Sequence, residues 1–264
     1  GHAGELAREI SSGDPQAVIV PVGGDGSINE VLNGLTNLDT VTLGLIPAGS
    51  GNDFAAGMQI SKDPEEAVRS LLDGNRSVLM DVGLLTYNDG TQRHFGISAG
   101  FGFDAAVCQE AFTSPLKAAL NRFGLGKAVY SAIAVKQIAF CKPFDATLET
   151  DSGEIQTIRD IFFIAFMNQK FEGGGLMMTP DARPDDGLLD LLVCAGITRP
   201  TLVKALPSAR HGGHVGVRGL HFIKARSVDI HASCPRAVHT DGEPLGMHDS
   251  LRVGFENQKL RVLI

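Results

Sequence analysis

Two glycine-rich segments follow apolar runs that are rich in β-branched residues, and each leads into a helical pattern. The first, Gly23–Ser27 (GGDGS), comes after Ala17–Val22, and the second, Pro47–Phe54 (PAGSGNDF), comes after Thr42–Pro47. At a strand-to-helix turn, glycines let a ligand approach the backbone, and the amides of the helix N-terminus attract phosphate oxygens. The first segment is neither a Walker A loop nor a GxGxxG motif. The chemistry that both segments suit is the binding of phosphate groups.

The spacing of the two segments supports this interpretation. They lie about 25 residues apart in successive strand–helix units, so both would open at the carboxyl edge of a parallel sheet, where ligands bind. Asp25 places a carboxylate inside the first turn, and Asn29 and Glu30 follow in the first helical turn. The alternative is that both segments are purely structural turns with capped helix starts. Taken together, they favour a nucleotide phosphate site.

The overall composition disfavours several classes of protein. The 264 residues include 23 Lys and Arg against 30 Asp and Glu, a net charge of −7. This acidity disfavours a broad nucleic-acid-binding face, and the absence of Trp, with only two Tyr, disfavours stacking on single strands. No apolar run reaches the roughly 18 residues of a spanning helix, and no signal peptide opens the chain. We therefore expect a soluble, cytoplasmic protein without a transmembrane segment that does not bind nucleic acid.

The elements that must position the two turns alternate along the first third of the chain. Helical patterns cover Gly4–Ile10 and Ser27–Gly34, and a helix start with a cap, a proline and acidic residues stands at Asp63–Glu66. Between them lie the two apolar strand patterns described above. Alternation of this kind predicts a parallel α/β unit.

The remainder of the chain predicts mostly antiparallel sheet. An Asn-Asp-Gly turn joins Ser77–Leu85 to Gln92–Ala99, and a second hairpin joins Phe144–Thr150 to Ile155–Met167. Further strands are expected at Gly187–Cys194, Ser227–Ala232, Leu251–Phe255 and Lys259–Ile264. Helices are expected at Phe103–Phe112, Lys127–Phe140 and Thr198–Leu206. The predicted fold is an α/β nucleotide lobe with a parallel sheet, followed by a β-rich, antiparallel, sandwich-like lobe.

GGDGSINEVLNGL (Gly23–Leu35) and LGLIPAGSGNDFA (Leu43–Ala55) resemble the catalytic region of the diacylglycerol kinase family, in particular the soluble bacterial lipid kinases. Further segments match this family in the expected order: Asp81-Val82-Gly83, His94–Gly102, Pro180–Leu189 and His239–Pro244. NAD kinases share the GGDG motif and a two-lobed architecture, but GSGNDFA is less similar to their sequences. The family's opening strand and Asn-Pro-x-Ser-Gly turn have no counterpart in residues 1–22.

The resemblance implies an ATP-binding lobe over residues 1–82 and a β-rich lobe over residues 83–264 with the lipid acceptor and a Mg²⁺ site. It leaves open whether the last strand returns to the first lobe. The implied reaction is ATP-dependent transfer of the γ-phosphoryl group to the primary hydroxyl of a diacylglycerol-like lipid. The implied ATP-site residues are Gly23, Gly24, Asp25, Gly26, Ser27, Asn29, Glu30, Ser50 and Asp53.

The same resemblance places the general base in the segment Asp241-Gly242-Glu243. We favour Glu243, with Asp241 as its rival or as its partner through metal and water, because a carboxylate must take the proton of the attacking hydroxyl. If the segment is an extended strand, both side chains point the same way. For Mg²⁺, the resemblance implies the side chain of Asp186 and the backbone carbonyls of Arg183 and Leu188. The alternatives are an ordinary surface turn and an ordinary hairpin turn.

The expected partner is a lipid substrate at a membrane surface, bound transiently, and a homodimer is left open. Two other functions remain as alternatives, an NAD kinase-like phosphotransferase and a nucleotide-sensing protein without turnover. Four cysteines without a CxxC pair are expected to be reduced thiols, and His211 and His214 are expected in a flexible loop. The glycine-rich segment Phe171–Leu176 lies near the expected lipid side.

Overall fold

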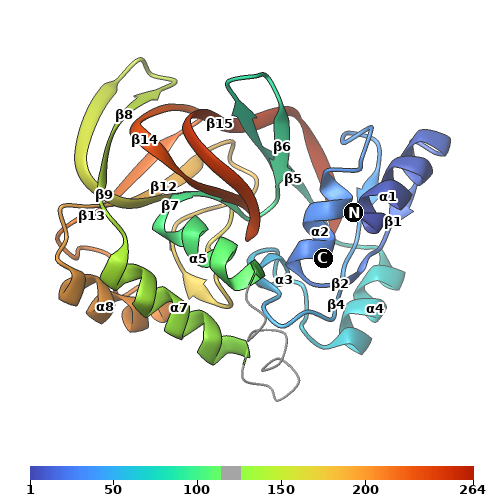
Figure 1. Ribbon diagram of the computed structural model, residues 1–264. Helices are drawn as coiled ribbons and strands as arrows, with labels where there is room; N and C mark the ends of the chain where they lie inside the picture. The colour runs from blue at the N-terminus through green and yellow to red at the C-terminus, as the bar shows by residue number, and fades with distance from the viewer. Residues whose placement is uncertain (114–125) are drawn as a thin grey trace.

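The computed structural model describes residues 1–113 and 126–264 (Figure 1). Its N-terminal part, blue and cyan in Figure 1, alternates helices with short strands. The elements are α1 (His2–Gly13), β1 (Val18–Ile19), β2 (Val22–Gly23), α2 (Asp25–Leu32), β3 (Thr42–Leu43), β4 (Ile46–Pro47), α3 (Asp53–Gly57) and α4 (Pro64–Asp73). The helix start predicted at Asp63 is confirmed, because its carboxylate accepts hydrogen bonds from the amides of Glu65 and Glu66.

Each of the two apolar runs forms two short strands instead of the single strand that the sequence predicts. β1 pairs in parallel with β3, and β2 pairs in parallel with β4. Between the two pairs Pro21 has no N–H to donate, although its carbonyl accepts a hydrogen bond from the Ile46 amide at 3.1 Å. Gly23 and Pro47 are paired at the end of the second ladder, so both glycine turns leave from the same edge.

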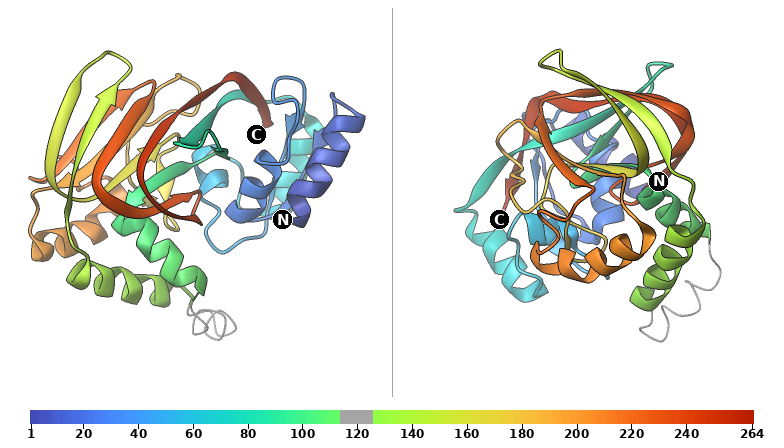
Figure 2. Two further views of the ribbon diagram at one scale, coloured as in Figure 1. Left: turned by 45° about the horizontal axis from the view of Figure 1, so that its top comes forward. Right: turned by 90° about the vertical axis from the view of Figure 1, so that its left-hand side faces the viewer.

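The rest of the chain is dominated by antiparallel strands, with helices on one side (Figures 1 and 2). The strands are β5 (Ser77–Tyr87), β6 (Gln92–Phe95), β7 (Ser98–Gly102), β8 (Phe144–Thr150), β9 (Ile155–Met167), β10 (Phe171–Glu172), β11 (Leu176–Met177), β12 (Leu189–Ala195), β13 (Leu220–Ala225), β14 (Val228–Thr240) and β15 (Glu243–Leu263). The helices are α5 (Phe103–Thr113), α7 (Gly126–Phe140), α8 (Arg199–Ser208) and the 3₁₀ turn η1 (Ala209–His211). Both predicted hairpins are present, as β5–β6 and β8–β9.

The strand β15 connects the two parts of the molecule. It pairs with β14 and β5 in antiparallel fashion, and near its end Arg261 and Val262 lie parallel to Thr42 and Leu43 of β3. One 21-residue strand therefore replaces the two strands expected at Leu251–Phe255 and Lys259–Ile264. Because β15 belongs to both parts, β1 and β3 join the antiparallel strands in a single mixed sheet of eleven strands.

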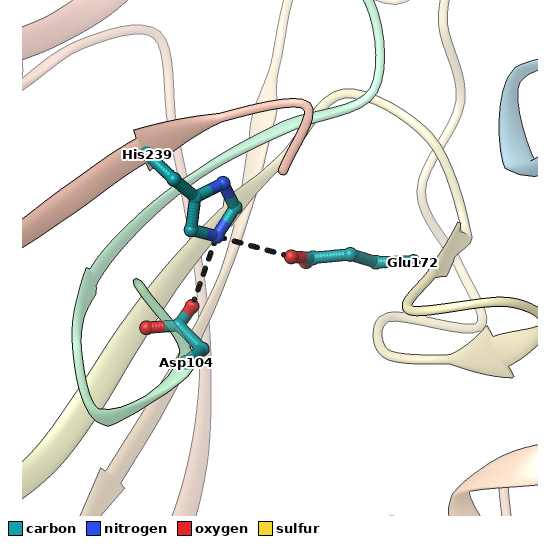
Figure 3. Close-up of side chains that lie close together, drawn as sticks. All are labelled: Asp104, Glu172 and His239. Carbon is teal, nitrogen blue, oxygen red and sulfur yellow. Dashed lines mark ion pairs between the residues drawn. The ribbon is translucent and has the colours of Figure 1, made fainter. Parts of the chain in front are cut away.

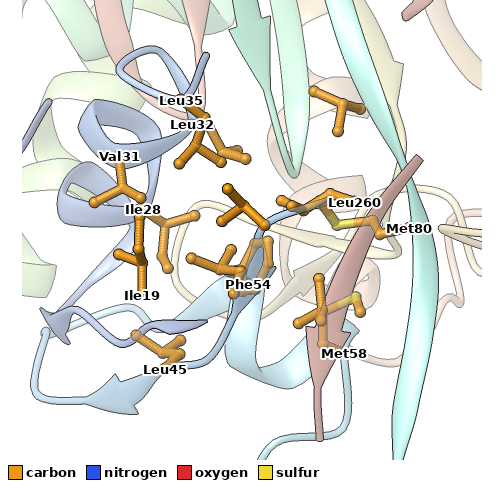
Figure 4. Close-up of a cluster of buried hydrophobic side chains, with 14 of the residues drawn as sticks. Ile19, Ile28, Val31, Leu32, Leu35, Leu45, Phe54, Met58, Met80 and Leu260 are labelled. Atoms are coloured by element: carbon orange, nitrogen blue, oxygen red, sulfur yellow. The ribbon is translucent and has the colours of Figure 1, made fainter. Parts of the chain in front are cut away.

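The N-terminal core fixes the helices that follow the glycine turns. Figure 4 shows Ile28 and Leu32 of α2, Phe54 of α3, Met80 of β5 and Leu260 of β15 in one apolar cluster. Each of these side chains is at most 1% exposed. Burying a side chain such as Phe54 contributes roughly 1.5–3 kcal/mol. The starts of α2 and α3 are therefore held against strands from both parts of the chain.

Helices α5, α7 and α8 cover one face of the antiparallel part (Figure 2). Phe162 and Phe163 of β9 are buried beneath them. No helix in the described ranges is both long enough and apolar enough to cross a membrane.

Two regions differ from the sequence-based expectations. The strand expected over Gln92–Ala99 is broken between β6 and β7. At the break, the amides of Gly96, Ile97 and Ser98 donate hydrogen bonds to the side chain of Asp241. The segment expected to be a flexible loop around His214 is packed. That imidazole is 2% exposed, and its Nε2 lies 2.9 Å from the Met178 carbonyl.

Candidate active site

The two glycine turns lie against each other at the edge where β2 and β4 end. A Cβ on Gly24 would lie 2.9 Å from the Cα of Gly49, closer than side chains approach, so the contact requires glycine. Asn52, with φ of 56°, closes the second turn by hydrogen bonds with the backbone of Gly49. Asp25 ties the turns together, because its Oδ1 accepts the Phe54 amide at 3.0 Å. The structure thus brings the two predicted phosphate-binding segments into one place.

Two carboxylates face this contact. The Oδ2 atoms of Asp25 and Asp53 lie 3.0 Å and 3.8 Å from the position that a Cβ on Gly51 would occupy. Asp53 is 5% exposed, and its Oδ1 is buried with no hydrogen-bond partner among the described residues. Burial raises the pKa of Asp53 to about 6, and the negative charge of Asp25 adds to the rise.

This pair of carboxylates fits a divalent cation. Mg²⁺ prefers oxygen ligands and is usually bound in proteins by one or two carboxylates together with substrate phosphates and water. Asp25 and Asp53 offer only oxygen, and a buried oxygen without a partner is costly unless something else binds it. A Mg²⁺ ion is therefore compatible with Asp25 and Asp53 at this position, which is a different place from the loop Arg183–Leu188 that the sequence predicts.

The hairpin β10–β11 lies against the second glycine turn. Gly173, Gly174 and Gly175 all have positive φ, between 67° and 102°, and the Gly174 amide donates to Asp53 Oδ2 at 2.7 Å. The backbone of the second part of the chain thus reaches a carboxylate of the first. Beside these glycines, the Glu172 side chain turns toward β14.

Glu172 and Asp104 both approach His239 (Figure 3). The His239 Nε2 lies 3.1 Å from Glu172 Oε1 and 3.5 Å from Asp104 Oδ2, and the imidazole is fully buried. Burial raises the pKa of Asp104, and the neighbouring His239 counteracts part of that rise. Asp104 stands at the start of α5, so three distant segments of the chain meet here.

The three side chains are close enough to hold a metal ion, with ligand atoms within 4.8 Å of one another. However, His239 Nδ1 accepts a hydrogen bond from the Gly242 amide at 3.2 Å, so the ring proton belongs on Nε2. A metal on Nε2 would require that proton on Nδ1, facing another donor. The geometry therefore favours an N–H that the two carboxylates share over a metal ligand.

The segment Asp241-Gly242-Glu243 is not an extended strand, and that expectation is wrong. Asp241 and Gly242 both have positive φ, 49° and 84°, and they form a two-residue turn in which Thr240 pairs with Glu243. The turn separates the two carboxylates that a strand would have aligned.

Asp241 is buried in the protein interior. Its two oxygens accept hydrogen bonds of 2.8–3.0 Å from the Asn29 side chain and from the amides of Gly96, Ile97 and Ser98. Burial raises the pKa of Asp241, while these donors act in the opposite direction. With its oxygens occupied, Asp241 holds the β6–β7 connection and is not presented to a substrate.

Glu243 faces the first glycine turn. Its Oε1 lies 3.0 Å from the position of a Cβ on Gly26, and no hydrogen bond or ion pair within the described ranges engages its carboxylate. The start of β15, the N-terminus of α2 and the β10–β11 hairpin thus frame a site with acidic groups from both parts of the chain.

The other predicted ATP-site residues divide into two groups. Gly23, Gly24, Gly26 and Ser27 belong to the first turn, and Ser50 is exposed in the second. Asn29 and Glu30 are directed elsewhere, which corrects their placement near the phosphates. The fully buried Asn29 contacts Asp241 and Arg93, and Glu30 accepts the Ala3 amide at the start of α1. Both lie beyond the amides at the helix N-terminus, on other faces of α2.

The predicted Mg²⁺ loop is anchored to β5 and β15. Asp81 Oδ2 accepts the Gly187 amide at 2.8 Å, and the Lys259 ammonium lies 2.9 Å from Asp81 Oδ1. Arg183 pairs with Asp185, and Asp186 Oδ1 accepts the Leu188 amide at 3.1 Å. Among the described residues, no hydrogen bond or ion pair joins this loop to either glycine turn. The metal-ligand roles of Arg183, Asp186 and Leu188 stay predictions.

Sequence reasoning did not identify Asp104, Glu172 and His239 as a cluster. His239 is the first residue of the segment His239–Pro244 (HTDGEP), and Glu172 directly precedes three glycines. An acidic residue next to a run of glycines was the signal that could have found Glu172. Nothing local marks Asp104, since it stands in an ordinary helix start.

Comparisons with known proteins identify the family to which the chain belongs. Residues 1–84 match the family described as the diacylglycerol kinase catalytic domain, and residues 97–264 match the YegS C-terminal NAD kinase beta sandwich-like domain. A diacylglycerol kinase of Mycobacterium tuberculosis is 30% identical over 90% of this chain and 73% of that protein. One of Bacillus subtilis is 28% identical over 94% of this chain and 77% of that protein.

The solved structures agree in fold. A crystal structure of a diacylglycerol kinase from Bacillus anthracis matches 99% of this chain and 80% of that chain, with a TM-score of 0.68 and 19% identity. The two family matches together cover most of the sequence and join the glycine turns to the β-sandwich-like part. The chain therefore belongs to the diacylglycerol kinase family of lipid kinases.

Proposed function

We propose that this protein transfers the γ-phosphoryl group of ATP to the primary hydroxyl of a diacylglycerol-like lipid. The relatives are named diacylglycerol kinases, and the two glycine turns present amides and a helix N-terminus at one edge. ATP would bind there with its phosphates toward the Asp25 and Asp53 carboxylates. The protein would work in the cytoplasm, at the surface of a membrane that contains its acceptor.

The observation that carries this proposal is the position of Glu243. A carboxylate without a hydrogen-bond or ion-pair partner among the described residues faces the N-terminus of α2 and the first glycine turn. A general base must be able to reach the hydroxyl proton while the oxygen attacks the phosphoryl group in line. Asp241 is occupied by four donors, which supports Glu243 over Asp241 as the base.

Asp25 and Asp53 would hold Mg²⁺ together with the phosphates. When bound, the cation neutralises phosphate charge and orients the phosphoryl group for transfer. Asp25 also keeps the turns together through the Phe54 amide, and the Gly174 amide keeps Asp53 oriented. A second cation at the loop Arg183–Leu188 would have a structural role, through Asp186 and the carbonyls of Arg183 and Leu188.

The remaining residues of the site position these groups. The Glu172–His239 contact holds the β10–β11 hairpin over the second turn, and the Gly242 amide links His239 to the turn that precedes Glu243. This arrangement would exclude water from the phosphoryl group and orient Glu243. In-line transfer depends mainly on such positioning and on electrostatics.

The test offers labelled ATP and Mg²⁺ with three separate acceptor conditions: diacylglycerol in mixed micelles, NAD, and no acceptor. Label in the lipid fraction supports the proposal, and label in NAD supports the NAD kinase alternative. ATP binding without transfer, to these acceptors or into a total lipid extract, supports the nucleotide-sensing alternative. The Glu243→Gln variant is the matched control, because it keeps the shape of the site and removes the proposed base.

A further inference from the structure

A groove between α7 and α8 forms an apolar surface on the helical side of the molecule. Its volume is about 410 Å³, and α7 contributes Val135, Ile138 and Ala139 to its lining. From α8 come Pro200 and Val203, together with two cations, Arg199 and Lys204. In Figures 1 and 2 the two helices lie side by side on the face of the sheet that they cover.

Large apolar side chains are also exposed on α5, α7 and α8. Phe140 at the end of α7 is 77% exposed, and Phe112 near the end of α5 is 66% exposed. Val135 and Val203 are 51% and 39% exposed. Single exposed apolar residues are common, but several on adjoining helices indicate an interaction surface. We refer to the groove together with Val135, Phe140 and Val203 as the α7–α8 face.

The charge of this face differs from the rest of the protein. Residues 133–143 and 196–218 contain six Lys and Arg and no Asp or Glu, in a chain whose net charge is −7. Lys142 and Lys204 are exposed and, within the described ranges, make no hydrogen bond or ion pair. Lys136 differs from them, because its ammonium lies 2.7 Å from Glu110 Oε1 of α5.

Arg199 is held in place and keeps the groove in shape. Its Nε donates to the Ile138 carbonyl at 2.9 Å, and its Nη2 donates to the Cys141 carbonyl at 3.0 Å. The guanidinium therefore caps the carboxyl end of α7 and joins it to α8. The surface is built by the fold and does not depend on a partner to form.

From these observations we infer that the α7–α8 face docks on the surface of an anionic lipid bilayer. Exposed aromatic and aliphatic side chains that are bordered by unpaired lysines suit the boundary between head groups and acyl chains. Negative lipids attract this face while they repel the acidic remainder of the chain, which orients the protein. A second copy of this chain is disfavoured as the partner of the α7–α8 face, because a symmetric contact would bring the cations of the two faces together.

The location fits the lipid kinase activity proposed above, on which this inference rests. α5 begins beside Asp104 in the candidate active site, and its first residue, Phe103, shares an apolar cluster with Ile138, which lines the groove from α7. The 11 residues of α5 span about 16 Å. An acceptor hydroxyl that protrudes from a bilayer at this face would therefore lie within about one helix length of the site.

The test measures cosedimentation with vesicles of equal parts phosphatidylglycerol and phosphatidylcholine, and with vesicles of phosphatidylcholine alone. Two variants alter the face, Lys142→Gln/Lys204→Gln and Phe140→Ser. Two matched controls alter exposed residues near or on α4, Lys62→Gln/Arg69→Gln and Leu72→Ser. We expect wild type to bind the anionic vesicles. The lysine variant should bind them roughly tenfold more weakly and Phe140→Ser several-fold more weakly, whereas the two controls should bind like wild type.

A second measurement separates docking from chemistry. All five proteins are assayed with a short-chain diacylglycerol dispersed as monomers, where equal turnover is expected because no surface is needed. If no protein phosphorylates this acceptor, the proposed kinase activity fails, while the vesicle binding still decides the docking. Docking is overturned if wild type does not bind anionic vesicles, if the face variants bind like wild type, or if the controls weaken equally. It is also overturned if the face variants convert a dimer to a monomer in sedimentation velocity, since the face would then join two copies.

Discussion

Two aspartates of this protein are buried to a similar degree but have opposite surroundings. Asp241 lies under the β6–β7 connection, where four donors occupy its oxygens. Asp53 lies between the second glycine turn and the β10–β11 hairpin, where one amide reaches Oδ2 and none of the described residues reaches Oδ1. A buried carboxylate oxygen without a donor costs free energy of folding. The comparison indicates that Asp241, whose hydrogen bonding is complete, supports the fold. Asp53, which has an oxygen without a donor, is available for chemistry.

The same contrast extends to the neighbours of each aspartate. Around Asp241, the Asn29 amide and the backbone of residues 96–98 are consumed in internal hydrogen bonds. Near Asp53, the Oε2 atom of Glu172 is also buried without a hydrogen-bond partner in the described part of the chain. The unsatisfied oxygens lie beside the glycine turns and the hairpin, where a ligand with its own cation would enter.

The largest expected effect tests the structural side of this comparison. Asp241→Asn replaces one acceptor oxygen by an NH₂ group that must face a donor. Breaking a buried charged network in this way costs about 3–5 kcal/mol of unfolding free energy. Urea denaturation measures the loss. The control is Asp249→Asn, at an exposed position of β15, whose unfolding free energy should stay within about 0.5 kcal/mol of wild type. A loss under about 1 kcal/mol would show that the four donors do not support the fold.

The next largest effect concerns Glu243, whose carboxylate makes no hydrogen bond or ion pair with the described residues. Glu243→Gln should lower kcat at least about a hundredfold, because the proposed base is lost, while ATP affinity and unfolding free energy stay near wild type. Single-turnover transfer, ATP titration and urea denaturation give the three quantities. If turnover survives in this variant, Glu243 is not the base, and the comparison of the two carboxylates on either side of the turn has to be reversed.

The sequence predicts much of the scaffold and less of the site. Local patterns identify both glycine turns, the cap at Asp63 and the two long hairpins, because each depends on neighbouring residues. They fail at the turn before Glu243, since an Asp-Gly pair fits a two-residue turn as well as a strand end. They also fail at β13, a partly exposed edge strand that follows a glycine-rich segment.

The missed parts of the site depend on contacts between distant segments. Asp104, Glu172 and His239 are brought together by the pairing of β7, β9 and β14, which no local pattern specifies. The sequence predicts Asn29 near phosphate because it stands beside the glycine turn, but its position along α2 directs it toward Asp241. Helix geometry, more than distance along the chain, decides which residues of a turn reach a ligand.

A third prediction uses the pKa of Asp53. Its folded-state value is raised to about 6, so the stability that its protonated form contributes is present at low pH and is lost as pH rises through 6. Between about pH 4.5 and 7.5, wild type should lose about 2 kcal/mol of unfolding free energy relative to Asp53→Asn. Urea denaturation of both proteins across this range measures the difference. A constant difference would mean that Asp53 ionises in the folded protein as in the unfolded chain.

The smallest effect concerns the loop Arg183–Leu188, where the comparison is between two adjacent aspartates. Asp185 pairs with Arg183, whereas Asp186 accepts only the Leu188 amide and is the proposed Mg²⁺ ligand. Binding to the folded state alone raises its stability, so Mg²⁺ should raise the Tm of wild type and of Asp185→Ala by a few degrees, which corresponds to about 1 kcal/mol. In Asp186→Ala this increment should shrink, while an increment due to Asp25 and Asp53 remains.

Calorimetry with and without Mg²⁺ separates these contributions, because loss of the hydrogen bond to Leu188 lowers Tm equally in both conditions. Only loss of a bound cation changes the increment itself. Adding Asp53→Asn to each protein removes the other proposed cation site, so that the remaining increment reports on the loop. If Asp186→Ala keeps the full increment in that background, the loop is an ordinary turn that Asp81 and Lys259 hold against β5 and β15.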